Sequence, residues 1–242
     1  MRRRPAATRT LRALAAVAVA AALAPPAAAA DDSFDAQRNA MVRLIRSRGV
    51  DDRTVLEAMR AVPRHEFVPA ADRKRAYGDH PLPIGYGQTI SQPYIVAFMT
   101  EVVQAEDGMK VLEVGTGSGY QAAILAEIGC SVFTIEIFEP LAESARDRLE
   151  RLGFESVTVR HGDGHDGWPE AAPFDAIVVT AAAGYIPPAL IEQLKPGGRM
   201  VIPVGSVYGV QNLIKVEKDR DGDTTTRNLL PVRFVPMLEG LR

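Results

Sequence analysis

The sequence predicts an α/β fold with a mostly parallel, doubly wound sheet. Between residues 111 and 204, short runs rich in Val, Ile and Leu alternate with segments of helical periodicity. Runs that are apolar throughout are typical of strands buried on both faces, which parallel sheets contain. After residue 204 the alternation ends, and two strand-like runs flank the turn Asp221-Gly222-Asp223. That pattern predicts an antiparallel hairpin at the C-terminus.

A helical flank over residues 34–76 and a loop over 77–93 are predicted in front of this series. Apolar residues at helical spacing indicate one helix from Phe34 to a Gly49 C-cap, and a second from Asp51 or Asp52 to Pro63. Three glycines and three prolines within residues 77–93 argue against helix and regular strand, so we expect a structured loop there. An apolar stripe over 95–103 predicts the next helix, with Ser91 as a candidate cap.

The remaining elements follow in order as strand 111–114, helix 120–128, strand 132–137, helix 140–152, strand 156–160, strand 174–179, helix 187–194, strand 199–204 and the hairpin strands 212–216 and 228–235. We expect a single domain over 31–242, in which 31–93 form the flank and substrate loop and 94–242 form the α/β core with its hairpin. About 212 residues are enough for one such domain with a full core.

Residues 1–30 have the pattern of a secretory signal peptide. A cluster of arginines precedes a charge-free, Ala-rich run from Ala13 to Ala24, and Ala28-Ala29-Ala30 offers a cleavage site. The run is too short to span a bilayer, which takes about 20 residues. We therefore expect cleavage after Ala30 and a periplasmic or secreted protein without a membrane segment in its mature form. The alternative is a cytoplasmic protein with an Ala-rich leader, or one that begins at Met41.

The charge of the predicted mature chain argues against nucleic acid as a partner. The leader holds five arginines and no acid, so 23 basic and 30 acidic residues remain, with a net charge of −7. No basic patch stands out to bind phosphates. Cys130 is the only cysteine, which excludes an internal disulfide, and its apolar surroundings predict a buried, unreactive thiol.

The stretch from Val111 to Tyr120 carries the clearest binding motif. A predicted strand runs into Gly115, Gly117 and Gly119, and a helix follows at once. Glycines allow a positive φ and a close approach of backbone to ligand, and a helix start offers free N–H groups. The chain has no Gly-Lys-Ser/Thr of a P-loop, and Tyr120 stands where a dinucleotide fingerprint needs its third glycine. The loop therefore indicates another nucleotide-like cofactor.

Three acids follow strands at the ends where ligands bind in open α/β sheets. Glu113 precedes the glycines, and a carboxylate there suits a positively charged or hydroxyl-rich ligand. Glu136 comes 23 residues later, near the offset of an acid that binds a ribose. Asp163, beside Gly164, could accept a hydrogen bond from an exocyclic adenine amine. Each could also be an ordinary capping acid.

Other chemistries find little support in the sequence. The four histidines show no metal-binding spacing, so we expect no metal site. A G-x-S-x-G nucleophile elbow is absent as well, which argues against a serine hydrolase.

The pattern Glu113-x-Gly-x-Gly-x-Gly119 resembles that of Rossmann-like methyltransferases that use S-adenosylmethionine (SAM). Residues 34–239 more specifically resemble the protein-L-isoaspartate (D-aspartate) O-methyltransferases. The matching segments are 41–49, Ala-Val-Pro-Arg-x-x-Phe-Val at 61–68, Leu-Pro-Ile-Gly-x-Gly-Gln-Thr-Ile-Ser-Gln-Pro at 82–93, 112–120, Arg-His-Gly-Asp-Gly at 160–164, 173–182 and Arg-Phe-Val-Pro-Met at 233–237. The 82–93 segment distinguishes this family from other methyltransferases.

The resemblance implies that Ser91 is the active-site serine. It also implies that the acceptor contacts Thr89, Ile90 and Val235, and that SAM is held by Glu113, Gly115, Gly117, Gly119, Tyr120, Glu136, Asp163 and Gly164. The implied substrate is the free carboxylate of an L-isoaspartyl or D-aspartyl residue in a damaged protein or peptide. Its methyl ester would lose methanol through a succinimide, which allows a return to normal aspartate.

Two alternatives remain open at this point. The chain could be a SAM methyltransferase with another acceptor, or an exported, non-catalytic protein that binds SAM or a nucleoside. We also expect the protein to be a monomer.

Overall fold

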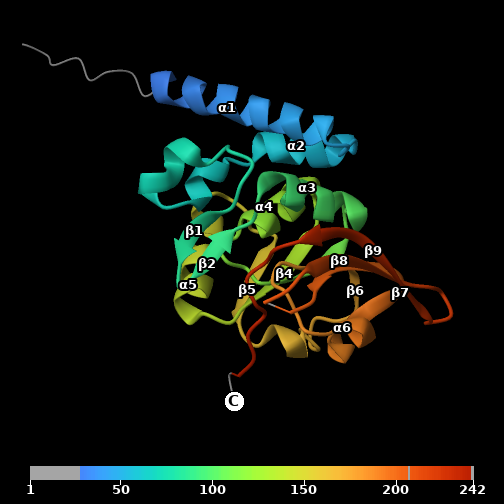
Figure 1. Cartoon of the computed structure of the whole chain (residues 1–242). Coiled ribbons are helices and arrows are strands. Elements are labelled where there is room, and N and C mark those ends of the chain that lie inside the picture. The colour runs from blue at the N-terminus through green and yellow to red at the C-terminus, as the bar shows by residue number, and fades with distance from the viewer. Residues whose placement is uncertain (1–27, 207, 241–242) are drawn as a thin grey trace, which may run out of the picture.

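The computed structural model describes residues 28–206 and 208–240 (Figure 1). Most of the predicted signal peptide, residues 1–27, therefore lies outside the described residues. The predicted cleavage point after Ala30 falls in the first turn of α1 (Ala28–Ser47). None of the helices in the described ranges combines the length and the hydropathy needed to cross a bilayer.

A seven-stranded sheet in the order β5-β4-β3-β6-β7-β8-β9 forms the centre of the fold. Its strands are β3 (Lys110–Val114), β4 (Ser131–Glu136), β5 (Val157–His161), β6 (Phe174–Val179), β7 (Leu194–Val204), β8 (Gln211–Lys218) and β9 (Thr224–Val232). The strands from β5 to β7 are parallel, and β8 and β9 add an antiparallel hairpin. The predicted fold class is confirmed, although β7 begins five residues earlier than expected.

Apolar side chains cover both faces of the sheet. Along β3, Val111 belongs to one hydrophobic cluster, whereas Leu112 and Val114 belong to another on the opposite face. Helices α4 (Tyr120–Ile128) and α5 (Glu139–Arg151) pack on the first face, and α6 (Pro188–Gln193) packs on the second. This double burial explains why the strands are apolar throughout instead of alternating.

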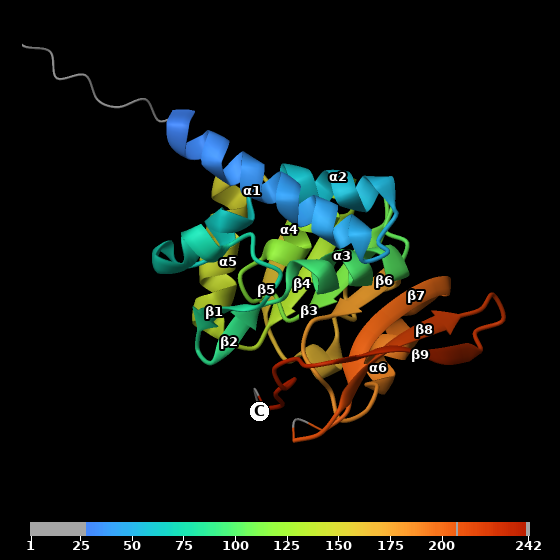
Figure 2. The same cartoon turned by 45° about the horizontal axis from the view of Figure 1, so that its top comes forward.

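The N-terminal flank is helical, as predicted, and shares the first cluster. In both Figure 1 and Figure 2, α1 and α2 (Arg53–Ala61) lie side by side above α3 (Pro93–Val102). Asp52 caps α2 by accepting hydrogen bonds from the backbone N–H groups of Thr54 and Val55. Two short 3₁₀ helices, Arg64–Phe67 and Ala70–Arg75, lead from α2 to the substrate loop.

The prediction that residues 77–93 contain no regular strand was wrong. Strands β1 (Leu82–Gly85) and β2 (Gln88–Ile90) form a two-stranded antiparallel sheet. Pro83 is tolerated because each strand of a two-stranded sheet has an edge that needs no ladder hydrogen bond. Tyr86 and Gly87 form the turn with φ values of 52° and 70°, so these residues make a tight hairpin possible.

The interpretation of Ser91 as a helix cap was also wrong. The N-cap of α3 is Gln92, whose own side chain makes no capping hydrogen bond. Instead, Oδ1 of Asp79 accepts a hydrogen bond from Tyr94 N in the first turn (2.9 Å). Pro93 begins the helix, where its missing N–H costs nothing.

Candidate functional site

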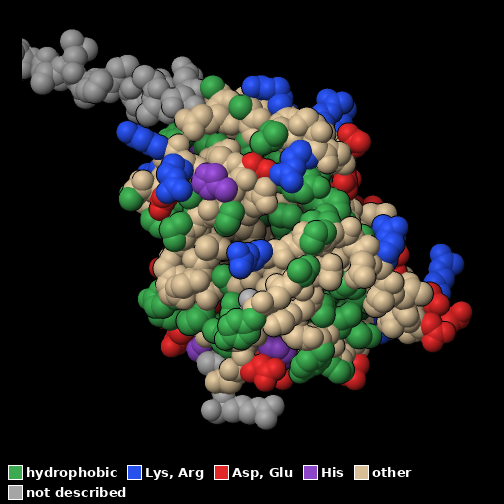
Figure 3. Space-filling model, in the orientation of Figure 1, with side chains coloured by type: hydrophobic (Ala, Val, Ile, Leu, Met, Phe, Trp, Pro, Cys, Tyr) green, Lys and Arg blue, Asp and Glu red, His purple; other side chains and the backbone are tan. Residues whose placement is uncertain are grey.

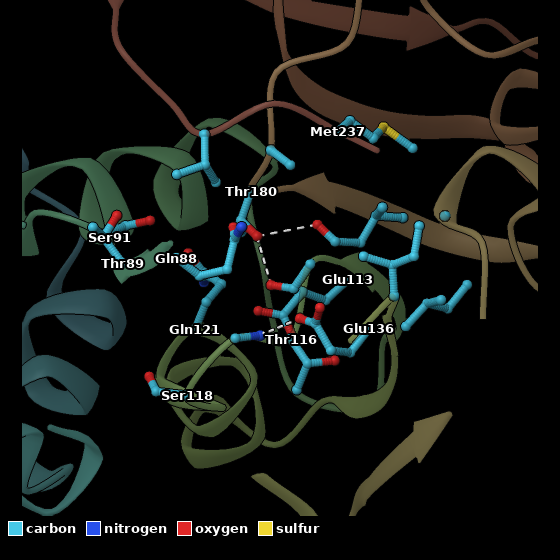
Figure 4. Close-up of a pocket in the computed structure, with 18 of the residues that line it drawn as sticks. Gln88, Thr89, Ser91, Glu113, Thr116, Ser118, Gln121, Glu136, Thr180 and Met237 are labelled. Atoms are coloured by element: carbon cyan, nitrogen blue, oxygen red, sulfur yellow. Dashed lines mark hydrogen bonds between the residues drawn. The ribbon is translucent and has the colours of Figure 1, made fainter. Parts of the chain in front are cut away.

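A cavity of about 750 Å³, including its open mouth, lies at the carboxyl ends of β3, β4 and β6. This is the edge of the sheet where the predicted site residues were expected. Figure 4 shows Thr89 and Ser91 on one side of the cavity and Glu113 and Glu136 on the other. Of the predicted residues, the cavity lining includes Thr89, Ile90, Ser91, Glu113, Gly115, Gly117, Tyr120, Glu136, Gly164 and Val235.

The glycine loop depends on its glycines. Gly115, Gly117 and Gly119 have φ values of 97°, 52° and 87°, in the left-handed region that disfavours other residues. A Cβ on Gly115 would also lie 2.5 Å from Oγ1 of Thr180. That hydroxyl, at the end of β6, donates to the carbonyls of Gly115 (2.6 Å) and Val114 (3.1 Å), and so fixes the loop between neighbouring strands.

Glu136 links the ends of β3 and β4. Its Oε2 accepts a hydrogen bond from Gly117 N (2.8 Å), and its Oε1 accepts one from Phe138 N (3.0 Å). A carboxylate has about four acceptor sites, so both oxygens can still accept from a ligand. Only 4% of the residue is exposed, and it reaches the cavity. This geometry suits the predicted contact with ribose hydroxyls.

Asp163 lies at the edge of the site, outside the cavity lining, while its neighbour Gly164 lies in it. Its Oδ1 accepts hydrogen bonds from the backbone N and the Nδ1 of His165. Its Oδ2 accepts one from Gly240 N (3.1 Å), in the C-terminal segment. Burial opposes ionisation, but these hydrogen bonds lower the pKa of Asp163. Its predicted contact with adenine stays a prediction.

Glu113 differs from the ionised carboxylate that we expected. It is fully buried, and this burial, with a smaller effect from nearby Glu136, raises its pKa to about 8. Thr134 donates a hydrogen bond to Oε2, whereas Oε1 is buried without a partner in the described part of the chain. Glu113 is therefore mostly protonated at neutral pH when no cation lies nearby, because an apolar environment disfavours the charged form.

Tyr120 connects the cofactor side of the site with the flank. Its ring packs edge-on against Phe67, with 5.4 Å between centroids, and the guanidinium of Arg64 lies 4.8 Å from the ring centre. The residue is 2% exposed. Its side chain therefore acts mainly in packing, although the residue contributes to the cavity wall.

Ser91 lies where the cavity meets a second, larger groove. Thr89, Ser91, Thr180 and Val235 line both spaces. The far side of the groove is formed by the end of β9 and the segment after it, from Leu230 to Val235. The predicted acceptor residues therefore lie at a junction from which a bulky ligand can reach the cofactor cavity.

The comparisons with known proteins agree with this geometry. Residues 36–242 match the family model described as protein-L-isoaspartate(D-aspartate) O-methyltransferase (PCMT). The chain belongs to this family. A relative in Syntrophobacter fumaroxidans, named protein-L-isoaspartate O-methyltransferase 2, is 60% identical over 222 residues, covering 88% of this chain and 90% of the relative. One in Cupriavidus necator, named protein-L-isoaspartate O-methyltransferase 1, is 53% identical and covers 97% and 95%.

Solved structures support the fold. A protein-L-isoaspartate O-methyltransferase superposes with a TM-score of 0.77 at 31% identity, covering 84% of this chain and 66% of that one. A second structure, from Plasmodium falciparum, has a TM-score of 0.74 at 24% identity and covers 84% and 99%. That protein is described as a putative protein-L-isoaspartate O-methyltransferase in complex with S-adenosyl-L-homocysteine.

Sequence reasoning missed several lining residues of this PCMT chain. They are Gln88, Thr116, Ser118, Gln121, Phe138, Thr180, Pro236, Met237 and Leu238, among others. Thr180 directly follows β6, so its place at a carboxyl strand end was a signal that could have been used. Gln121 gave no such signal, because its burial against Thr100 of α3 depends on tertiary packing.

Replacement of Glu113 by Gln should make the unfolding free energy of the ligand-free protein less dependent on pH. The folded-state pKa of about 8 lies above the unfolded value, so the folded protein binds more protons than the unfolded chain between about pH 5 and 8. Wild-type stability from this group is complete below that window and falls as the pH rises through it. The variant, which cannot ionise, should gain stability relative to wild type by a few kcal/mol across the window.

Urea unfolding at a series of pH values measures this difference. Glu101→Gln offers a control, since Glu101 is a hydrogen-bonded carboxylate outside the cavity, which accepts from the backbone N–H groups of Asp51 and Asp52. A constant difference between wild type and Glu113→Gln from pH 5 to about pH 8 would show that Glu113 is ionised in the folded protein.

Proposed function

We propose that this chain transfers the methyl group of SAM to the free carboxylate of L-isoaspartyl and D-aspartyl residues in damaged proteins and peptides. The observation that carries the proposal is the shared wall of the two spaces, where the Ser91 loop meets the glycine loop. One space has the size and polarity of a cofactor site, and the other has room for a polypeptide segment. Family membership supports both assignments.

The residues of the cavity fit SAM. Oε1 of Glu113 and Oε1 of Gln121 are buried acceptors without partners in the described part of the chain, and both residues line the cavity. Such acceptors suit the ammonium and sulfonium groups of SAM. Glu136 is available to ribose hydroxyls, and Ile135, Ile137 and Phe138 offer apolar surface to a base. When bound, SAM supplies an electrophilic methyl group.

The protein's own part in the reaction is mainly to position the acceptor. A carboxyl group with a pKa near 4 is already ionised at neutral pH, so no strong base is required. The hydroxyl of Ser91 can donate a hydrogen bond to one carboxylate oxygen and leave the other free to react. Orientation of this kind, with water kept out, supplies a large part of the rate. The methyl ester product then closes to a succinimide with loss of methanol.

Tritiated SAM with an isoaspartyl peptide and its normal aspartyl twin tests the proposal. We expect methylation of the isoaspartyl peptide and little of its twin. Equal transfer to both peptides would indicate a SAM methyltransferase with another acceptor. Binding of SAM without transfer to either would favour a non-catalytic binding protein.

We also propose that the protein is exported and acts outside the cytoplasm as a monomer. The support for export is the sequence pattern of residues 1–30. N-terminal sequencing of the native protein should begin at Asp31, and a start at Met1 or Met41 would refute export. Light scattering after gel filtration should give the mass of one chain, and a dimer mass would refute the monomer.

A further inference from the structure

Arg64 is a buried cation beside the proposed acceptor site. It lies in the 3₁₀ helix Arg64–Phe67 of the flank, and its exposed fraction is 0%. Its Nε donates to the carbonyl of Ala76 (2.8 Å), and its Nη2 donates to the carbonyl of Ser91 (2.8 Å). No carboxylate forms an ion pair with it within the described residues. The third nitrogen, Nη1, is buried without a hydrogen-bond partner there.

Three parts of the fold meet at this guanidinium. Ala76 belongs to the flank, Ser91 to the substrate loop, and Tyr120 is the first residue of α4, directly after the glycine loop. The guanidinium lies 4.8 Å from the centre of the Tyr120 ring, within the range of a cation–π contact. A rigid, planar side chain with these three contacts fixes the place of Ser91 relative to the glycine loop.

Burying the charge of Arg64 costs folding free energy, which a purely structural role does not require. Burial lowers its pKa to about 10, opposed by the Tyr120 hydroxyl and by the negative charge of Asp79, with which it forms no direct ion pair, so the side chain is still charged at neutral pH. Removing a cation from water without a paired anion is unfavourable, and an apolar side chain of similar size often serves stability as well or better. A buried, unpaired cation in this position therefore points to a role in the reaction.

The charges around the cavity indicate that role. Its lining includes Glu113 and Glu136 but no Lys or Arg. A substrate carboxylate that binds near these acids is stabilised electrostatically by a positive charge behind Ser91. Figure 3 shows basic side chains scattered over the visible face of the molecule instead of gathered in one patch. Arg48 and Arg233 line the second groove, and Arg48 is paired with Asp79. Arg64 is the cation that bonds directly to Ser91.

We propose that Arg64 is a positioning residue for methyl transfer, which holds Ser91 in line with the glycine loop and makes the acceptor site attractive to a carboxylate. The inference rests on the proposed function. Arg64 acts through the Ser91 carbonyl and through its charge, without contact with the substrate.

Two substitutions separate its effects. Arg64→Lys keeps the charge and loses the three-way contact, whereas Arg64→Met loses both. For both variants we expect kcat to fall about 100-fold, because a displacement of about 1 Å in the reacting groups has an effect of that size. The KM for SAM should stay within about threefold of wild type, because the carboxylates and glycines that face the cofactor are unchanged. The KM for the isoaspartyl peptide should rise more in Arg64→Met than in Arg64→Lys.

Val55→Ala is the matched control. Val55 is fully buried in α2 of the same flank and lines neither space, so its truncation loosens the flank and leaves the hydrogen bond between Arg64 and Ser91 in place. We expect it to lower the melting temperature and to keep kcat near wild type. The proposal fails if Val55→Ala loses as much kcat as the Arg64 variants at a similar loss of melting temperature. It also fails if neither Arg64 variant folds, or if KM for SAM rises in step with the loss of kcat.

The wild-type protein shows whether the proposed function or only the role of Arg64 has failed. Wild-type protein that does not methylate the isoaspartyl peptide refutes the function itself. Wild-type protein that does so, with Arg64 variants that keep full kcat, refutes only the role of Arg64.

Discussion

Ser91→Ala should lower kcat for isoaspartyl methylation by two orders of magnitude or more, with little change in SAM affinity. Within the described part of the chain the Ser91 hydroxyl takes part in no hydrogen bond, while its carbonyl is held by Arg64 (2.8 Å). The hydroxyl is therefore free to hold a substrate carboxylate in line with the reacting methyl group, and its loss removes that orientation. Steady-state kinetics with the isoaspartyl peptide, together with calorimetric titration of SAM, measure both quantities.

Ser131→Ala is a suitable control for this experiment. Ser131 begins β4 at the amino end of the sheet, opposite the cavity, and is exposed. Its replacement should leave both kcat and SAM affinity near wild type. If Ser91→Ala instead abolished SAM binding, the serine would belong to the cofactor cavity, and the carboxylate-holding role would be wrong.

The parallel sheet could be predicted because its signal is local. Each strand is a short apolar run, and the two-sided burial seen along Val111, Leu112 and Val114 is what such a run implies. The glycine loop was equally accessible, since a positive φ at three alternate positions admits few residues other than glycine. Glu136 followed from its distance along the chain from that loop.

The rest of the site depends on contacts between distant segments. The β1–β2 hairpin was missed because its proline and glycine content argued against a strand. Proline is tolerated when one edge of a strand forms no ladder hydrogen bonds, and composition does not show whether such an edge exists. The pKa of Glu113 could not be predicted, since it results from complete burial and from the approach of Glu136. The C-terminal segment reaches the cavity through the hydrogen bond from Met237 N to the Ala182 carbonyl, a contact that no local pattern encodes.

The position of Arg64 could not be predicted from the sequence either. Its family motif at 61–68 was visible in the sequence, but nothing there distinguishes a surface arginine from a buried one. Only the fold brings its guanidinium to the Ser91 carbonyl and to the ring of Tyr120. The residues that orient a site are therefore harder to predict than those that contact its ligand, because their roles depend on the packing of neighbours.

Glu136→Ala should weaken SAM binding about 100-fold or more. Hydrogen bonds to a charged acceptor contribute about 1.5–3 kcal/mol each, and the predicted ribose contact would lose them. The substitution also removes the acceptor for Gly117 N and Phe138 N, so the glycine loop loses the bond that ties it to β4. Both effects reduce cofactor affinity, and calorimetric titration of SAM measures their sum.

Glu139→Ala separates this effect from a general loss of negative charge. Glu139 lies three residues further along the chain, at the exposed start of α5, and does not line the cavity. Its removal should change SAM affinity by less than about twofold, because an exposed charge interacts weakly with a site that it does not contact. If Glu136→Ala bound SAM as well as Glu139→Ala does, the carboxylate of Glu136 would only brace the loop, and the ribose would have to be held elsewhere.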